Sequence, residues 1–120
     1  MPIRSFERYA FIVETAEQII RSRLGEPICI ATLCERLGVS ERRLRSAFRT
    51  MHGMSPYRHL RKLRMAEARR ALLTTDPARA TVTVTRIAMD HGFVELGRFA
   101  VEYRMAFGES PSATLQRAQA

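Results

Sequence analysis

The sequence predicts an all-α fold in which two helix-turn-helix subdomains are joined by a long linker helix. Apolar residues recur at three- and four-residue steps through most of the 120 residues, which is the spacing of amphipathic helices. A short helix, a glycine turn and a second helix occur once in each half, and this order of elements is a helix-turn-helix. One continuous helical stretch, residues 55–74, lies between the two halves.

Three helices are predicted before this stretch, at residues 5–24, 30–37 and 41–51. Gly25 follows the first of them, where glycine commonly ends a helix. Gly38 supplies the tight turn between the second and the third. Ser40 is placed to cap the third helix, and Glu41 lies near the positive end of that helix dipole. Together they form the first predicted subdomain, residues 1–54.

The predicted linker helix, residues 55–74, begins with Ser55 as its N-cap and Pro56 in its first turn, where the missing N–H costs nothing. Its apolar residues do not form one stripe. They fall on two roughly opposite sides, with Tyr57, Leu60, Ala68, Ala71 and Leu72 on one and Leu63, Ala66 and Leu73 on the other. Such a helix packs against two bodies. The alternative is an irregular surface helix, because Arg61 and Arg64 interrupt the first side.

Three further helices are predicted after the linker, at residues 84–91, at 95–107 and in a short final segment that contains Leu115. A turn-rich connector, residues 74–83, comes before them. Gly92 and Phe93 repeat the glycine turn of the first half. The second predicted subdomain is therefore residues 75–120.

The two subdomains are related in sequence. Gly53-Met54-Ser55-Pro56 recurs as Gly108-Glu109-Ser110-Pro111, 55 positions later. The same offset takes Leu44 to Phe99, Phe48 to Tyr103, Arg49 to Arg104 and Leu60 to Leu115. Upstream of the turn the offset is 54, as from Gly38 to Gly92, so the second copy has one extra residue between its turn and its second helix. So many matches in register argue against two unrelated helix pairs.

The balance of charge favours a nucleic-acid partner. The chain has 20 Lys+Arg against 12 Asp+Glu, a formal net charge of +8, and Lys62 is its only lysine. Arginine offers a planar fork of donors suited to phosphate and to guanine edges. Nucleic acid is therefore the first partner to consider, and an acidic protein or an anionic membrane the second. The alternative origin of the excess of arginine over lysine is a GC-rich genome, which produces the same bias without any nucleic-acid partner.

Other function classes find little support in the sequence. No apolar run approaches the roughly 18 to 20 residues that span a bilayer, and the N-terminus lacks a signal-peptide core, so we expect a cytoplasmic protein. Cys29 and Cys34 lie near none of the histidines, so no zinc spacing is present and we expect Cys34 to be reduced and structural. Neither a Gly-rich phosphate loop nor a nucleophile elbow occurs. Asp90 and His91 are neighbours that point about 100° apart. We expect no enzyme activity, no metal and no cofactor.

Four stretches, taken together, carry a family resemblance. They are SERRLRSAFR at 40–49, GMSP at 53–56, RIAMDHGF at 86–93 and YRMAFGESP at 103–111. They strongly resemble the DNA-binding domain of the AraC/XylS family of bacterial transcription regulators, over residues 12–117. The resemblance implies two helix-turn-helix subdomains bridged by a linker helix, and sequence-specific binding to double-stranded DNA. The helices at 41–51 and 95–107 would enter successive segments of the major groove, roughly 34 Å apart. The alternative is a basic helical module that binds an acidic protein or RNA.

The helix at 41–51 carries the candidate base-reading residues. Its exposed face presents Arg42, Arg45, Ser46 and Arg49, with Arg43 to one side. Arginines along one exposed stripe suit the major groove, where Arg bonds guanine O6 and N7 together. The family's base-contacting positions match Arg42, Arg45 and Ser46. The alternative is a solvated basic face.

The same face of the helix at 95–107 is mostly small or apolar. It consists of Gly97, Ala100, Val101 and Arg104, with Arg98 beside it. We therefore expect the first subdomain to supply most of the sequence discrimination, and the second to hold phosphates through Arg98 and Arg104. Further phosphate contacts are expected at the starts of two helices, from Tyr57, Arg58, Thr85 and Arg86.

RNA polymerase is a further partner that the resemblance implies. Most members of the family also carry a separate domain for effector binding or dimerisation. We expect a small-molecule effector only if such a domain is missing from this chain, which is either a stand-alone regulator or the C-terminal piece of a longer one.

Overall fold

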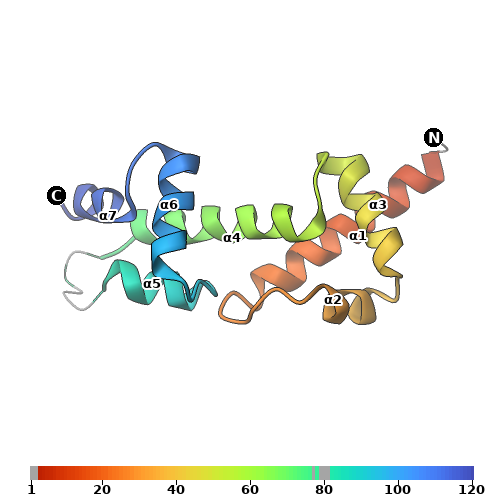
Figure 1. The fold of residues 1–120 in the computed structure, drawn as a ribbon, viewed down its shortest axis with the longest axis horizontal. Helices are drawn as coiled ribbons and strands as arrows, with labels where there is room; N and C mark the ends of the chain where they lie inside the picture. The colour runs from red at the N-terminus through yellow and green to blue at the C-terminus, as the bar shows by residue number, and fades with distance from the viewer. Residues whose placement is uncertain (1–2, 77, 79–81) are drawn as a thin grey trace. The chain divides into compact units, whose positions relative to one another are not determined.

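The computed structural model describes residues 3–76, 78 and 82–120. Within these ranges the chain forms seven α-helices and no strand, so the predicted all-α class is confirmed. The helices are α1 (Ile3–Arg21), α2 (Ile30–Leu37), α3 (Glu41–His52), α4 (Pro56–Leu73), α5 (Val84–Asp90), α6 (Leu96–Phe107) and α7 (Pro111–Gln119) (Figure 1). None of these helices has a long enough apolar stretch to span a bilayer.

The chain folds as two compact units. The described residues of Met1–Arg23 and Ile28–Leu63 form unit 1, and those of Leu24–Pro27 and Arg64–Ala120 form unit 2. Helix α4 contributes its first part to unit 1 and the rest to unit 2. Each unit holds one helix-turn-helix, α2 with α3 and α5 with α6. The predicted division into a first subdomain (1–54), a linker helix (55–74) and a second subdomain (75–120) stays a prediction.

The core of unit 1 consists of residues from α1, α2, α3 and the start of α4. Its buried members are Ile12, Val13, Ala16, Ile20, Leu33, Leu44, Ala47, Phe48 and Leu60. Leu44, Ala47 and Phe48 are fully buried, as the helical pattern of α3 predicts. Because these three residues face the core, the opposite side of α3 faces solvent.

The core of unit 2 consists of residues from the second part of α4, from α5, α6 and α7, and from the turn after α5. Its buried members are Met65, Ala68, Leu72, Ile87, Ala88, Phe93, Phe99, Tyr103 and Leu115. The buried phenol of Tyr103 donates a 2.7 Å hydrogen bond to the Thr114 hydroxyl, which in turn donates to Glu109 Oε2 at 2.9 Å. This polar chain fixes α7 on α6.

The first helix ends earlier than its sequence pattern predicts. We expected it to continue to Leu24, but α1 ends at Arg21. Leu24 belongs to unit 2, and its carbonyl oxygen lies 3.0 Å from the position that a Cβ on Gly92 would occupy. The chain therefore leaves the helix early because residues 24–27 pack against the turn that follows α5.

The linker helix does serve two bodies, but the predicted two sides are wrong. Its apolar residues divide by position along the helix, because Leu60 lies in the core of unit 1 whereas Ala68 and Leu72 lie in that of unit 2. Tyr57 and Leu73, one from each predicted side, are each 44% exposed and belong to neither buried core. Met65, which neither predicted side included, is buried in unit 2.

Candidate nucleic-acid interface

The ends of α3 are fixed by local chemistry. The Ser40 hydroxyl accepts a 3.1 Å hydrogen bond from the Arg43 backbone N–H, so Ser40 is the N-cap, as predicted. Gly53 ends the helix in the left-handed conformation at φ 69°, where other residues are strained. With both ends fixed and one side buried, the helix presents a defined face to solvent.

The exposed face of α3 brings the predicted base-reading residues together. An open surface hollow on this helix is lined by Glu41, Arg42, Arg45, Ser46 and Arg49. Ser46 is half-buried and the other four side chains are exposed. We name these five residues the α3 face. It can present several arginine donors, and one serine hydroxyl, to a single ligand.

Glu41 is the residue of the α3 face that the sequence analysis did not assign to the interface. Its Oε1 atom lies 2.6 Å from Arg45 Nη2, one helical turn away. Both side chains are more than half exposed, at 55% for Glu41 and 64% for Arg45. An exposed pair of this kind contributes little to stability, so Arg45 can exchange the carboxylate for another acceptor. The i, i+4 spacing of Glu and Arg was the signal that could have revealed it.

Arg43 lies to one side of this face, as predicted. Its guanidinium carbon is 6.0 Å from the centre of the Tyr9 ring on α1. It also lines a second hollow with side chains of α1 and with Leu37 and Val39. Arg43 is therefore positioned at the junction of α1 and α3, beside the α3 face.

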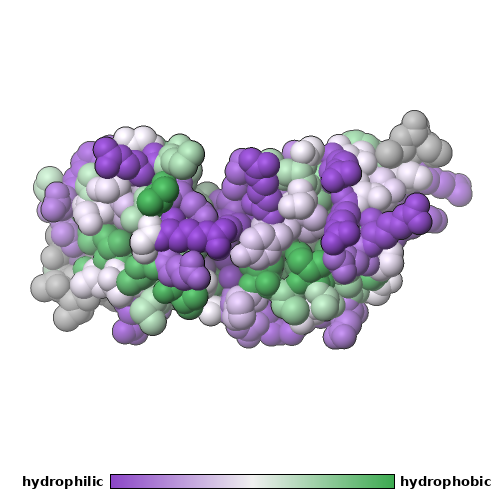
Figure 2. All heavy atoms as spheres, viewed as in Figure 1, coloured by the Kyte–Doolittle hydropathy of each residue, from purple (hydrophilic) through white to green (hydrophobic). Residues whose placement is uncertain are grey.

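The outward side of α6 differs in chemistry. Gly97, Arg98, Ala100, Val101 and Arg104 are all exposed, as the offset from α3 predicts. The Nε atom of Arg98 lies 2.9 Å from Glu102 Oε1, one turn along the helix. In the space-filling view, apolar surface gathers over α5 and the adjoining part of α6 (Figure 2).

Met105 extends the apolar part of α6 and was missed in the sequence analysis. It is 83% exposed and follows Val101, which is 61% exposed, by one helical turn. Their i, i+4 spacing places both on the same side of α6. An apolar residue one turn after Val101 was the available signal.

The predicted phosphate contacts at helix starts are exposed. Tyr57 and Arg58 lie in the first turn of α4, where the Arg58 backbone N–H donates to the Ser55 hydroxyl at 3.3 Å. Thr85 and Arg86 lie in the first turn of α5, and Arg86 Nε is 3.4 Å from Asp90 Oδ1. The first pair lies in unit 1 and the second in unit 2, and both pairs are open to a ligand at the surface.

Comparison with known proteins identifies the kind of domain. Residues 33–117 match a family described as a helix-turn-helix domain. The chain is 40% identical over 105 residues to the probable thc operon regulatory protein of Rhodococcus erythropolis, covering 88% of this chain and 31% of that protein. It is 38% identical over 104 residues to the XylDLEGF operon transcriptional activator of Pseudomonas putida, covering 87% and 32%. The chain thus spans about a third of the length of these relatives.

Solved structures of similar domains agree with this match. A probable AraC family transcriptional regulator from Rhodopseudomonas palustris is 37% identical, with a TM-score of 0.76 over 91% of this chain and 98% of that one. An AraC-type regulator from Chromobacterium violaceum has a TM-score of 0.79 at 23% identity, over 89% and 91%, which supports the fold alone. With the family match over most of its length and this pair of helix-turn-helix units, the chain belongs to the AraC/XylS family of DNA-binding transcription regulators.

Proposed function

We propose that α3 is the base-reading element of this regulator, and that it enters the major groove of a specific double-stranded site. The observation that carries the proposal is the α3 face, on which three arginines and a serine line one open hollow. Arg42, Arg45 and Arg49 can each bond guanine O6 and N7, and Ser46 can bond any base edge. Glu41 in the same hollow can accept from a cytosine amino group.

We propose that α6 positions the protein rather than reading bases. Arg98 and Arg104 are exposed and suited to phosphate, whereas Gly97, Ala100 and Val101 offer no hydrogen bond to a base edge. Val101 and Met105 can contact a thymine methyl group. Their exposure also favours a second candidate role, in which the outward side of α6 contacts a protein.

We further propose that the starts of α4 and α5 hold phosphates. Tyr57 and Arg58 would contact phosphates of the DNA segment bound by α3. Thr85 and Arg86 would contact phosphates of the segment bound by α6. The exposure of all four side chains supports this. Arg86 would exchange its exposed partner Asp90 for a phosphate, a small cost for a pair that is 75% and 58% exposed.

The biological role that we propose is control of transcription in the bacterial cytoplasm, through contact with RNA polymerase at the bound site. The names of the relatives, an operon regulatory protein and an operon activator, support this role. A small-molecule effector would act through a separate domain of the kind that regulators of this family carry.

A footprint on a duplex selected from random sequence, at physiological salt, tests the proposal. We expect two protected major-groove segments about one helical turn apart. Methylation of guanine N7 should block binding in the segment contacted by α3 only, whereas ethylation of phosphates should block it in both. Protection indifferent to sequence, or stronger binding to single strands or RNA, would contradict base reading by α3. Protection of a single segment would favour the protein-contact role for α6.

A further inference from the structure

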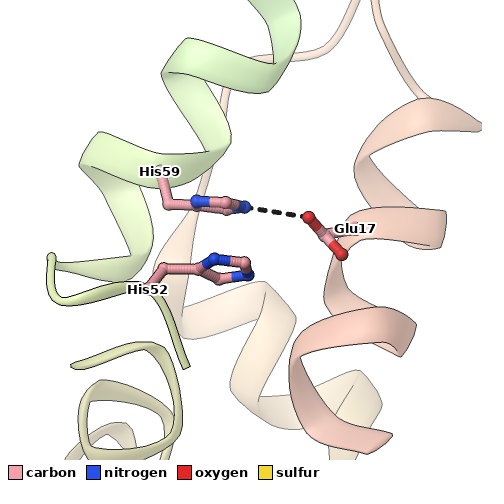
Figure 3. A group of neighbouring side chains, drawn as sticks. All are labelled: Glu17, His52 and His59. Carbon is pink, nitrogen blue, oxygen red and sulfur yellow. Dashed lines mark hydrogen bonds and ion pairs between the residues drawn. The ribbon is translucent and has the colours of Figure 1, made fainter. Parts of the chain in front are cut away.

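Three side chains that are far apart in the sequence meet in unit 1, outside the α3 face. They are Glu17 of α1, His52 at the end of α3 and His59 of α4 (Figure 3). One potential ligand atom from each lies within 4.8 Å of the others. Both imidazole rings extend toward the Glu17 carboxylate, so their nitrogens and its oxygens converge (Figure 3).

Each member of the group is held by a defined contact. His59 Nε2 lies 2.8 Å from Glu17 Oε2, and these two side chains are only 17% and 18% exposed. The His52 and His59 rings are stacked, with their centres 3.9 Å apart and their planes within 16°. The buried Phe48 ring lies 5.5 Å from that of His59 and 6.4 Å from that of His52. The group therefore has a preformed pair, an exposed third member stacked on it and an apolar wall.

We propose that Glu17, His52 and His59 form a binding site for zinc or another divalent transition ion of similar chemistry. Two imidazoles and one carboxylate are ligands that zinc, cobalt and nickel accept. Magnesium and calcium prefer six or more oxygen ligands, so two imidazole nitrogens select against them. Three protein ligands leave a fourth tetrahedral position to water.

The three ligand atoms already lie close to the separations that a tetrahedral ion needs. Zinc bonds of about 2.0 to 2.1 Å place tetrahedral ligand atoms about 3.3 Å apart. The 2.8 Å pair of His59 and Glu17 would open by about half an ångström to admit the ion. The widest separation, within 4.8 Å, would close through rotation of the exposed His52 ring, which would leave its stacked position on His59.

Such an ion would join α1 to the end of α3 and the start of α4, the helices that surround the core of unit 1. Binding to the folded state then raises the midpoint of thermal unfolding. This consequence needs no DNA, so the inference stands independently of base reading by α3. The sequence lacks a Cys and His zinc motif, but the proposed site does not depend on one. Its ligands include a carboxylate and come from positions up to 42 residues apart.

The test measures zinc affinity and zinc-dependent unfolding of the whole chain and its variants. His52→Phe keeps a stacked ring without a ligand nitrogen, and Glu17→Gln removes the carboxylate. Matched controls are Glu14→Gln, an exposed carboxylate on α1, and Cys29→Ser, an exposed thiol. We expect zinc to raise the unfolding midpoint of the wild type and both controls equally, and its affinity to fall about tenfold or more in the two ligand variants.

A measurement on the wild type guards against variants that fold poorly. Zinc should shift the imidazole nitrogen signals of His52 and His59 in an NMR titration, while those of His91 in unit 2 stay unchanged. Unshifted signals of His52 and His59, or equal zinc affinity in the wild type, His52→Phe and Glu17→Gln, would overturn the site.

Discussion

Glu41 Oε1 lies 2.6 Å from Arg45 Nη2, so an arginine at the centre of the α3 face is held by a carboxylate of the same helix. To bond a base, as we propose, Arg45 must first leave Glu41. The Glu41 carboxylate must then stand close to the phosphates or accept from a base. We therefore expect Glu41 to oppose binding to DNA in general, and to favour only sites that offer it a donor.

Replacing Glu41 tests this opposition. Glu41→Gln should strengthen binding to a scrambled duplex by about 0.5 to 1 kcal/mol, or roughly two- to fivefold, a small effect because the pair is exposed and screened. It should strengthen binding to the selected site less, so that discrimination falls. Fluorescence anisotropy on both duplexes measures the two changes. Glu14→Gln on α1 removes the same charge, and an equal gain from that variant would reduce the effect to net charge alone.

Gly92 is the glycine whose replacement should cost unit 2 most. Its φ is 82°, and an added Cβ would lie 2.5 Å from Arg64 Nη1 and 3.0 Å from the Leu24 carbonyl oxygen. Gly92→Ala should lower the free energy of unfolding by about 1 to 3 kcal/mol, through left-handed strain and this clash. The control is Gly97→Ala, because Gly97 lies in α6 with open space around its Cβ position.

Chemical denaturation compares the two glycine variants. Gly97→Ala should leave the unfolding free energy unchanged or raise it by up to about 1 kcal/mol, since alanine favours a helix. A Gly92→Ala variant as stable as the wild type would contradict the packing of residues 24–27 against the turn after α5.

Tyr103 and Thr114 should be energetically coupled through the hydrogen bond between them. Both side chains are fully buried, and the Thr114 hydroxyl also donates to Glu109. Tyr103→Phe should cost about 1 kcal/mol, and Thr114→Val about 1 to 3 kcal/mol because it leaves the phenol unsatisfied. The double variant should cost less than the sum of the two, as measured by denaturation. Strict additivity would mean that the 2.7 Å contact contributes nothing.

The two cysteines should differ in reactivity. The Thr32 side chain, which hydrogen-bonds the thiolate, lowers the pKa of the exposed Cys29 below its ordinary value, whereas burial raises the pKa of Cys34. A lower pKa leaves more thiolate at neutral pH, so iodoacetamide should modify Cys29 first. Thr32→Val should raise the pKa of Cys29 and move its alkylation to higher pH, with Cys34 unaffected. Peptide mapping by mass spectrometry follows both sites, and faster modification of Cys34 would refute the assignment.

Features set by neighbouring residues could be predicted from the sequence. Ser40 and Gly38 define the limits of α2 and α3 through local capping and turn chemistry, and α2 has the predicted bounds. The internal repeat predicted the exposed side of α6 from that of α3, because Phe99 and Tyr103 are buried at the positions of Leu44 and Phe48. The arginines of the α3 face follow from helical periodicity alone.

Features set by distant residues could not be predicted. The end of α1 depends on Leu24 packing against Gly92, and helical periodicity carries no information about that partner. The division of α4 between two cores depends on which neighbour each half meets, so two sides were inferred where the helix changes partner along its length. Glu17 and His59 meet across 42 residues, which no local motif connects.

The most direct test of the account compares Arg45→Ala with Arg98→Ala on the selected duplex and on a scrambled one, over a range of salt concentrations. Arg45→Ala should reduce the ratio of specific to non-specific affinity by about 1 to 3 kcal/mol, because it removes a base contact. Arg98→Ala should weaken binding to both duplexes equally and reduce the salt slope by about 1, because it removes a phosphate contact. Equal loss of discrimination from the two variants would contradict the assignment of base reading to α3.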